Sequence, residues 1–222
     1  MLRTTAHIEI LCLNVTDASQ VIAMNHRSDL QLQPLPGVPS YFTSSIHYDW
    51  CMVNERFQVD SFVDELTNNK GHCVVIDVGM NDGFYTMLSA ALGFRVYGFE
   101  LQDVCVQIAY DFLKRNQFED RVIILNKPVS AHNNYVIPIP LSKACDGGFS
   151  FSGRFTNATR GIPLGHLSLP VGDKKEFHTI ALDTFVPSGT KVDILKIDTE
   201  GHEPQVLEGA MGLIRARAIC KI

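Results

Sequence analysis

A cluster of acidic residues follows a strongly apolar stretch near the end of the 222-residue chain. The segment 195–210 reads LKIDTEGHEPQVLEGA, so Asp198, Glu200 and His202 come directly after a run typical of a buried strand. A carboxylate or an imidazole at such a strand end can accept a proton from a substrate or hold a cation. We therefore expect Asp198, His202 and Glu200 to be the catalytic candidates.

A glycine-rich turn is the second chemical feature. It reads Asp77-Val-Gly79-Met-Asn81-Asp82-Gly83 and follows the apolar run 73–79. Glycines after a first strand let the main chain approach a ligand closely. A dinucleotide fingerprint that starts at Gly79 needs glycines at positions where this chain has Asn81 and Phe84. The turn therefore argues against NAD, and a nicotinamide-dependent oxidoreductase stays the alternative.

Glu100 ends the next apolar stretch, VYGFE. A carboxylate at this place can accept hydrogen bonds from the vicinal hydroxyls of an adenosine ribose. We expect Asp77, Asp82 and Asp198 to lie at neighbouring strand ends, which would make the crevice acidic. Such a crevice repels a pyrophosphate and suits the sulfonium and ammonium groups of S-adenosylmethionine.

Apolar runs and amphipathic stretches alternate along most of the chain, which predicts right-handed βαβ units. The predicted fold is therefore an α/β, Rossmann-like, doubly wound and mostly parallel sheet. Strands are predicted at 73–79, 95–100, 121–126, 177–185 and 191–198, and helices at 56–69, 84–92, 103–117 and from Pro204 onward, with Glu203 favouring that helix start.

Three regions fit this alternation less well. We expect residues 1–53 to form an N-terminal extension of unclear structure and residues 54–222 to form the core domain. The segment 130–176 holds a possible edge strand, NNYVIPIPL, and then a long Gly-, Ser- and Pro-rich loop, which we expect to serve substrate recognition. The final ICKI indicates a further strand, so we expect a core that is incomplete at the C-terminus.

Composition narrows the range of partners. The net charge of −5 argues against a broad nucleic-acid-binding face, and no stretch has the length and apolarity of a membrane span. Six cysteines without a CxxC pair favour free thiols over a disulfide framework or a zinc site. We expect no bound metal and a cytoplasmic location; the sequence does not determine the oligomeric state.

Four segments together resemble the FkbM-type S-adenosylmethionine-dependent methyltransferases: VVIDVGMNDGFYT, VYGFE, TIALDTF and VDILKIDTEGHEPQVLEGA. The resemblance implies the class I methyltransferase fold and methyl transfer to a hydroxyl of a sugar, a glycan or another small molecule. Met80 and Asp82 differ from the small and aliphatic residues usual in the glycine turn of that family. The alternative that is not an enzyme is a Rossmann-like binding module, which keeps the fold but does not catalyse a reaction.

The resemblance also implies roles for individual residues. Gly79, Asn81 and Gly83 would line the methionine part of the donor next to Asp77, Glu100 would hold the ribose, Asn126 or Ser130 would reach the adenine, and Asp198 would lie beside the donor amine and the acceptor. An alcohol acceptor must lose its proton, for which Asp198 or His202 is the predicted base. We expect burial among other carboxylates to raise the pKa of Asp198.

Overall fold

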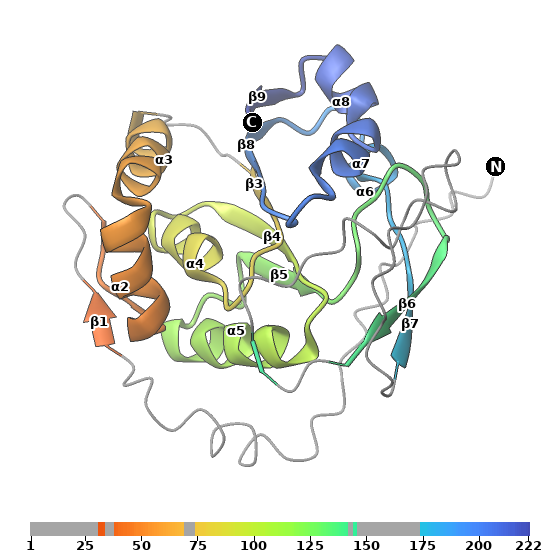
Figure 1. Ribbon diagram of the computed structural model, residues 1–222. Coiled ribbons are helices and arrows are strands. Elements are labelled where there is room, and N and C mark those ends of the chain that lie inside the picture. Colours follow the sequence, from red (N-terminus) through yellow and green to blue (C-terminus); the bar gives the residue numbers. More distant parts are fainter. Residues whose placement is uncertain (1–30, 34–37, 69–73, 142–143, 146–173) are drawn as a thin grey trace.

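A five-stranded parallel sheet forms the centre of the computed structural model, which describes residues 31–33, 38–68, 74–141, 144–145 and 174–222 (Figure 1). The strand order is β5-β4-β3-β8-β9, and every neighbouring pair is parallel. The strands are β3 (Val74–Val78), β4 (Arg95–Phe99), β5 (Val122–Leu125), β8 (Val192–Ile197) and β9 (Ile219–Lys221). The predicted doubly wound, mostly parallel fold is confirmed.

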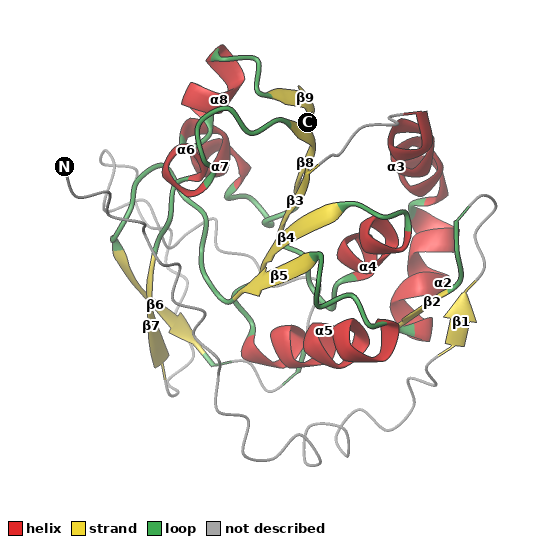
Figure 2. Cartoon of the chain, turned by 180° about the vertical axis from the view of Figure 1, so that it is seen from behind, coloured by secondary structure: helices red, strands yellow, loops and turns green. Residues whose placement is uncertain are grey.

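Helices cover both faces of the sheet (Figure 2). Side chains alternate along β3, so Val75 packs into one core cluster and Ile76 into the other. One face carries α2 (Ser45–Asn54), α3 (Arg56–Asn68), α4 (Phe84–Ala91) and α5 (Asp103–Asn116). The opposite face carries α6 (Leu182–Phe185), α7 (Glu203–Glu208) and α8 (Met211–Arg215).

The order of the strands defines where a ligand is expected. From β3 the chain continues to β4 on one side, whereas β8 lies on the other side of β3. The connections therefore diverge at the carboxyl ends of β3 and β8, which is the switch point at which open α/β sheets bind ligands. Gly79, Glu100 and Asp198 all directly follow the ends of β3, β4 and β8.

Two predicted elements differ in the structure. The predicted strand 177–185 is wrong in its second half, because β7 (Lys174–His178) ends early and Leu182–Phe185 is the short helix α6. The helix predicted from Pro204 begins at Glu203 but is divided into α7 and α8. Both changes involve Asp183, whose carboxylate accepts hydrogen bonds from the Gly212 and Leu213 amides of α8 at 2.7 and 2.8 Å. Asp183 thus caps a new helix start.

Two small antiparallel sheets lie outside the main sheet. β1 (Gln31–Gln33) pairs with β2 (Tyr41–Thr43), and β6 (Val136–Pro140) pairs with β7. The predicted strand around Val136 therefore exists, as an edge of this separate sheet. Most of the predicted long loop, 146–173, lies outside the described residues.

The described part of the predicted N-terminal extension packs against the core. Tyr41 and Cys51 belong to the same apolar cluster as α4 and α5. The Phe42 main chain exchanges two hydrogen bonds with the Asn116 side chain, of 2.7 and 2.8 Å. The predicted boundary at 53/54 falls in the last turn of α2.

The expectation that cysteines stay free is wrong for one pair. Cys105, in the first turn of α5, forms a disulfide with Cys145, 40 residues further along the chain. Cys51 is buried and free, and Cys220 is exposed and free. Within the described residues, no helix has the length and apolarity to cross a membrane.

Candidate active site

The glycine turn is held against the ends of β4 and β8. The amides of Gly79 and Met80 both donate to the carbonyl of Phe99, at 2.9 and 3.0 Å. Gly79 has a φ of +77°, and a Cβ at this position would lie 1.8 Å from the carbonyl oxygen of Asp198. Residue 79 must therefore be glycine for the turn to lie beside the end of β8.

Met80 replaces a small residue of the family pattern without opening the turn. Its side chain is buried and lies over Gly98 of β4, where a Cβ would come within 2.5 Å of the Met80 sulfur. The missing side chain at residue 98 thus provides the space that Met80 fills. The larger residue is accommodated by the core and does not occupy the ligand side of the turn.

Asp77 lies inside the sheet and is satisfied by the protein itself. It is fully buried, and its carboxylate accepts hydrogen bonds from Thr86 Oγ1 at 2.8 Å and Lys196 Nζ at 3.1 Å. Lys196 also donates to the Gly79 carbonyl at 3.2 Å. Burial opposes the charge of Lys196, but the neighbouring Asp77 and Asp198 raise its pKa. Lys196 is thus a permanent cation directly beneath the glycine turn.

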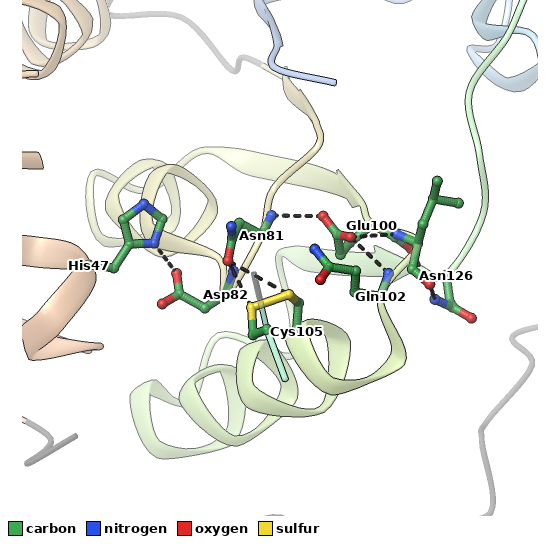
Figure 3. The surroundings of a disulfide bond; sticks show 9 residues. His47, Asn81, Asp82, Glu100, Gln102, Cys105 and Asn126 are labelled. Atoms are coloured by element: carbon green, nitrogen blue, oxygen red, sulfur yellow. Dashed lines mark hydrogen bonds and ion pairs between the residues drawn. A yellow bond between two sulfur atoms is a disulfide. The ribbon is translucent and has the colours of Figure 1, made fainter. Parts of the chain in front are cut away.

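Glu100 is buried at the end of β4 and faces the glycine turn (Figure 3). Oε2 accepts the Asn81 amide at 3.0 Å, and Oε1 accepts the Leu101 and Gln102 amides at 2.8 Å each. The Gln102 side chain adds a further hydrogen bond. Burial raises the pKa of Glu100, although these hydrogen bonds act in the opposite direction. The carboxylate is thus fixed in orientation before any ligand arrives.

Asn126 and Ser130 lie in different surroundings. Asn126 Nδ2 donates to the carbonyls of Glu100 and Leu101 at 3.0 and 3.1 Å, so it supports the Glu100 segment. Ser130 is buried, and its Oγ lies 3.2 Å from Nε2 of the equally buried His202. Burial lowers the pKa of His202 to about 4, against a smaller opposing effect of Glu203. His202 is therefore neutral at pH 7.

The acidic loop after β8 separates into distinct environments. The Asp198 side chain is 57% exposed, and Lys196 Nζ lies 3.8 Å from its Oδ2. The predicted burial of Asp198 among carboxylates is therefore wrong. Glu200 has a φ of +52° and is exposed. Glu203 accepts the Thr199 and Gly201 amides at 2.9 and 3.0 Å, and although burial opposes it, these bonds lower its pKa.

The charge of the crevice also differs from the expectation. Asp77, Asp82, Glu100 and Asp198 do gather at adjoining strand ends, but cations face three of them. Lys196 lies next to Asp77 and Asp198, and His47 pairs with Asp82. The crevice is therefore less negative than the sequence predicted, because Lys196 and His47 offset these carboxylates. Among the residues described, no cluster of three or more His, Cys, Asp and Glu side chains is placed to hold a metal ion.

Sequence reasoning missed three contributors to this region: Lys196, His47 and the disulfide. Cys145 Sγ lies 2.8 Å from Asn81 Oδ1, so the disulfide rests against the glycine turn. Of these three, Lys196 alone could have been found from the sequence. It lies within the apolar run VDILKI, and a buried lysine needs a partner of opposite charge. The other two depend on residues that come together only in the folded chain.

A doubly wound sheet with a glycine turn and a strand-end glutamate at its switch point is typical of Rossmann-like enzymes that bind adenosine ligands. The family model of the methyltransferase FkbM domain matches residues 77–222. The chain therefore belongs to the FkbM methyltransferase family. This membership confirms the predicted class and its methyl donor, S-adenosylmethionine, and it decides against the nicotinamide oxidoreductase.

Solved structures show weaker similarities. The human methyltransferase 10 domain containing protein is 18% identical, with a TM-score of 0.29, over 52% of this chain and 56% of that one. The delta-N METTL16 MTase domain is 20% identical, with a TM-score of 0.31, over 52% and 51%. The chain thus spans about half the length of these structures. No curated protein matches the sequence.

Proposed function

We propose that the chain is an S-adenosylmethionine-dependent O-methyltransferase that acts on a hydroxyl of a sugar, a glycan or another small molecule. The observation that supports this most is the placement of Glu100 and Asp198. The buried, preoriented carboxylate of Glu100 follows β4, and the exposed carboxylate of Asp198 follows β8. The Gly79 turn, which follows β3, lies between them. Family membership supplies the class of reaction.

The residues present fit the donor in chemical terms. Glu100 is an acceptor for a ribose hydroxyl, and the open Asp198 carboxylate suits the ammonium group of the donor. Of the groups that hydrogen-bond to Glu100, the Gln102 side chain is the one that is not part of the main chain, so we propose that a ribose hydroxyl would replace it. When bound, S-adenosylmethionine supplies an electrophilic methyl group. Asn81, with its amide on Glu100, and Gly83 would line the donor on the turn side.

Asp198 is the proposed base for the acceptor hydroxyl. Its side chain is open to a substrate, whereas His202 is buried against Ser130 and has a pKa of about 4. Lys196 lies behind Asp198 and keeps the carboxylate at the end of β8. The exposed Glu200 is the second candidate on the same loop. Holding the acceptor in line and excluding water would account for most of the rate.

A methyl-transfer assay tests the proposal. Methyl-labelled S-adenosylmethionine is incubated with the protein and with glycans, small alcohols, amines or RNA as separate acceptors. We expect label on hydroxyl acceptors, a loss of about 100-fold or more for Asp198→Asn, and a smaller loss for Glu200→Gln. Unchanged transfer by Asp198→Asn would remove Asp198 from the mechanism. Donor binding without transfer to any acceptor would favour the non-catalytic module.

A further inference from the structure

Asp82, the acidic residue that departs from the family pattern, has a partner from the N-terminal helix α2. His47 Nδ1 lies 2.5 Å from Asp82 Oδ1, and the side chains are 21% and 9% exposed. His47 is in the first turn of α2, and its amide donates to the N-cap Ser44 Oγ at 3.3 Å. Its ring packs against Phe84, with the centroids 5.6 Å apart. The pair is thus largely withdrawn from water and fixed on both sides.

The contact continues through the turn to the strand-end glutamate (Figure 3). The Asp82 amide donates to Asn81 Oδ1 at 2.7 Å, and the Asn81 amide donates to Glu100 Oε2 at 3.0 Å. Asn81 has a φ of +54°, a left-handed conformation that asparagine adopts more readily than most residues other than glycine. The turn is therefore held by Glu100 on one side and, through Asp82, by His47 on the other.

We propose that His47 and Asp82 form a positioning pair through which α2 holds the turn 79–83 in the conformation that presents Asn81 and Glu100 to the methyl donor. The proposal rests on the proposed function, since it assigns these residues to the donor site. In this proposal His47 acts on the donor site indirectly. Its effect passes through Asp82 and Asn81, and it makes a segment outside the family match part of the donor site.

The ionisation state of the pair supports this role. Burial opposes a charged imidazole, but the hydrogen bond that His47 donates to the Asp82 carboxylate raises the pKa of His47 to about 10. The Cys51 thiol, one turn further along α2, is the other titratable group acting on His47, in the same direction. The imidazolium therefore persists through the neutral range, and Asp82 has a permanent counter-charge there.

Calorimetric titration with S-adenosylhomocysteine tests the proposal on the full chain. We expect His47→Gln and Asp82→Asn to weaken binding by about 10-fold at a temperature where each variant is folded. His178→Gln is the matched control, because His178 is exposed on β7, and it should bind as the wild type does. The double variant His47→Leu/Asp82→Ile replaces the ion pair by an apolar contact between the same two positions and should recover affinity to within about 3-fold.

Two further readouts separate positioning from simple stabilisation. Amide exchange of the peptide 79–86 in the ligand-free protein should be faster in His47→Gln than in the wild type, with the exchange of β5 unchanged. Both proteins should lose affinity as the pH approaches 10, because the ammonium group of the ligand titrates there. The loss should be steeper in the wild type than in the double variant, because only the wild type also loses the His47 charge. Unchanged affinity and turn exchange in His47→Gln, with only a lower melting temperature, would overturn the proposal. If the wild type fails to bind the donor product, the proposed function fails, and the exchange result still decides for or against the pair.

Discussion

The main chains of Gly79 and Asp198 are in direct contact. A Cβ on residue 79 would lie 1.8 Å from the Asp198 carbonyl oxygen, and the Asp198 amide donates to the Val78 carbonyl at 2.9 Å. The two segments that carry most of the family resemblance, separated by over a hundred residues, therefore meet at one point of the sheet. The glycine serves this contact between strands as well as the approach of a ligand.

Substitution at residue 79 should therefore cost more than its backbone conformation alone. Gly79→Ala should lower the free energy of unfolding by at least about 3 kcal/mol, from a left-handed φ plus a main-chain clash. Gly93→Ala is the control, since Gly93 has a φ of +92° but no atom within 4 Å of the added Cβ. It should cost about 1–2 kcal/mol. Urea denaturation measures both, and equal losses would contradict the contact.

Removal of the Lys196 cation should leave Asp77 buried without a counter-charge. Lys196→Met should destabilise the protein by about 3–5 kcal/mol, as is usual when one partner of a buried pair is lost. The double variant Lys196→Met/Asp77→Leu should recover most of this loss. Lys191→Met, at an exposed lysine that donates to the Arg217 carbonyl, should change stability by less than about 0.5 kcal/mol. A single variant as stable as the wild type would refute the role of Lys196.

His202 should make stability depend on pH in the acidic range. Its pKa falls from an ordinary 6.5 to about 4 on folding, so the unfolded chain binds a proton first as the pH drops. Stability should decrease between pH 6.5 and 4, by on the order of 3 kcal/mol in total. Unfolding of His202→Gln should lack this component, whereas the exposed His178→Gln should keep it. Parallel pH profiles for His202→Gln and the wild type would contradict neutral burial.

The Cys105–Cys145 disulfide should stabilise the chain by closing a loop. With a sequence separation of 40, the chain-entropy relation gives about 4 kcal/mol. The Cys105→Ser/Cys145→Ser variant should unfold at a correspondingly lower urea concentration, while Cys220→Ser, at an exposed free thiol, should not. Mass spectrometry of the unreduced protein should find a peptide pair joined through Cys105 and Cys145. Two alkylated thiols at these positions would disprove the bond.

The sheet could be predicted because its signals are local. Runs such as CVVIDVG and KVDILKID are short, apolar and bounded by turns, and they became the paired strands β3 and β8. The strand prediction for 177–185 failed at Asp183. Its carboxylate accepts hydrogen bonds from amides of α8, which lie about 30 residues further along the chain. Periodicity carries no information about such a contact.

The candidate site could be predicted in its positions and less well in its charges. Glu100 and Asp198 stand where the alternation of elements placed them. His47, in α2, pairs with Asp82, in the glycine turn, across a sequence separation of 35 residues. No regular spacing in the sequence predicts this pairing. Cys105 and Cys145 likewise show no motif. Long-range partners of this sort decide whether a carboxylate is available to a ligand, and only the folded chain reveals them.

The proposed placement of the donor at Glu100 is tested most directly by two affinities. These are the affinities for S-adenosylhomocysteine and for its 2′-deoxy analogue, measured in the wild type and in Glu100→Gln. If Glu100 binds the ribose, the wild type should prefer the hydroxylated ligand by about 10-fold to 100-fold, as expected for a hydrogen bond to a charged group. This preference should largely disappear in Glu100→Gln. Equal affinities for both ligands in the wild type, or the same preference in Glu100→Gln, would contradict the placement of the donor at Glu100.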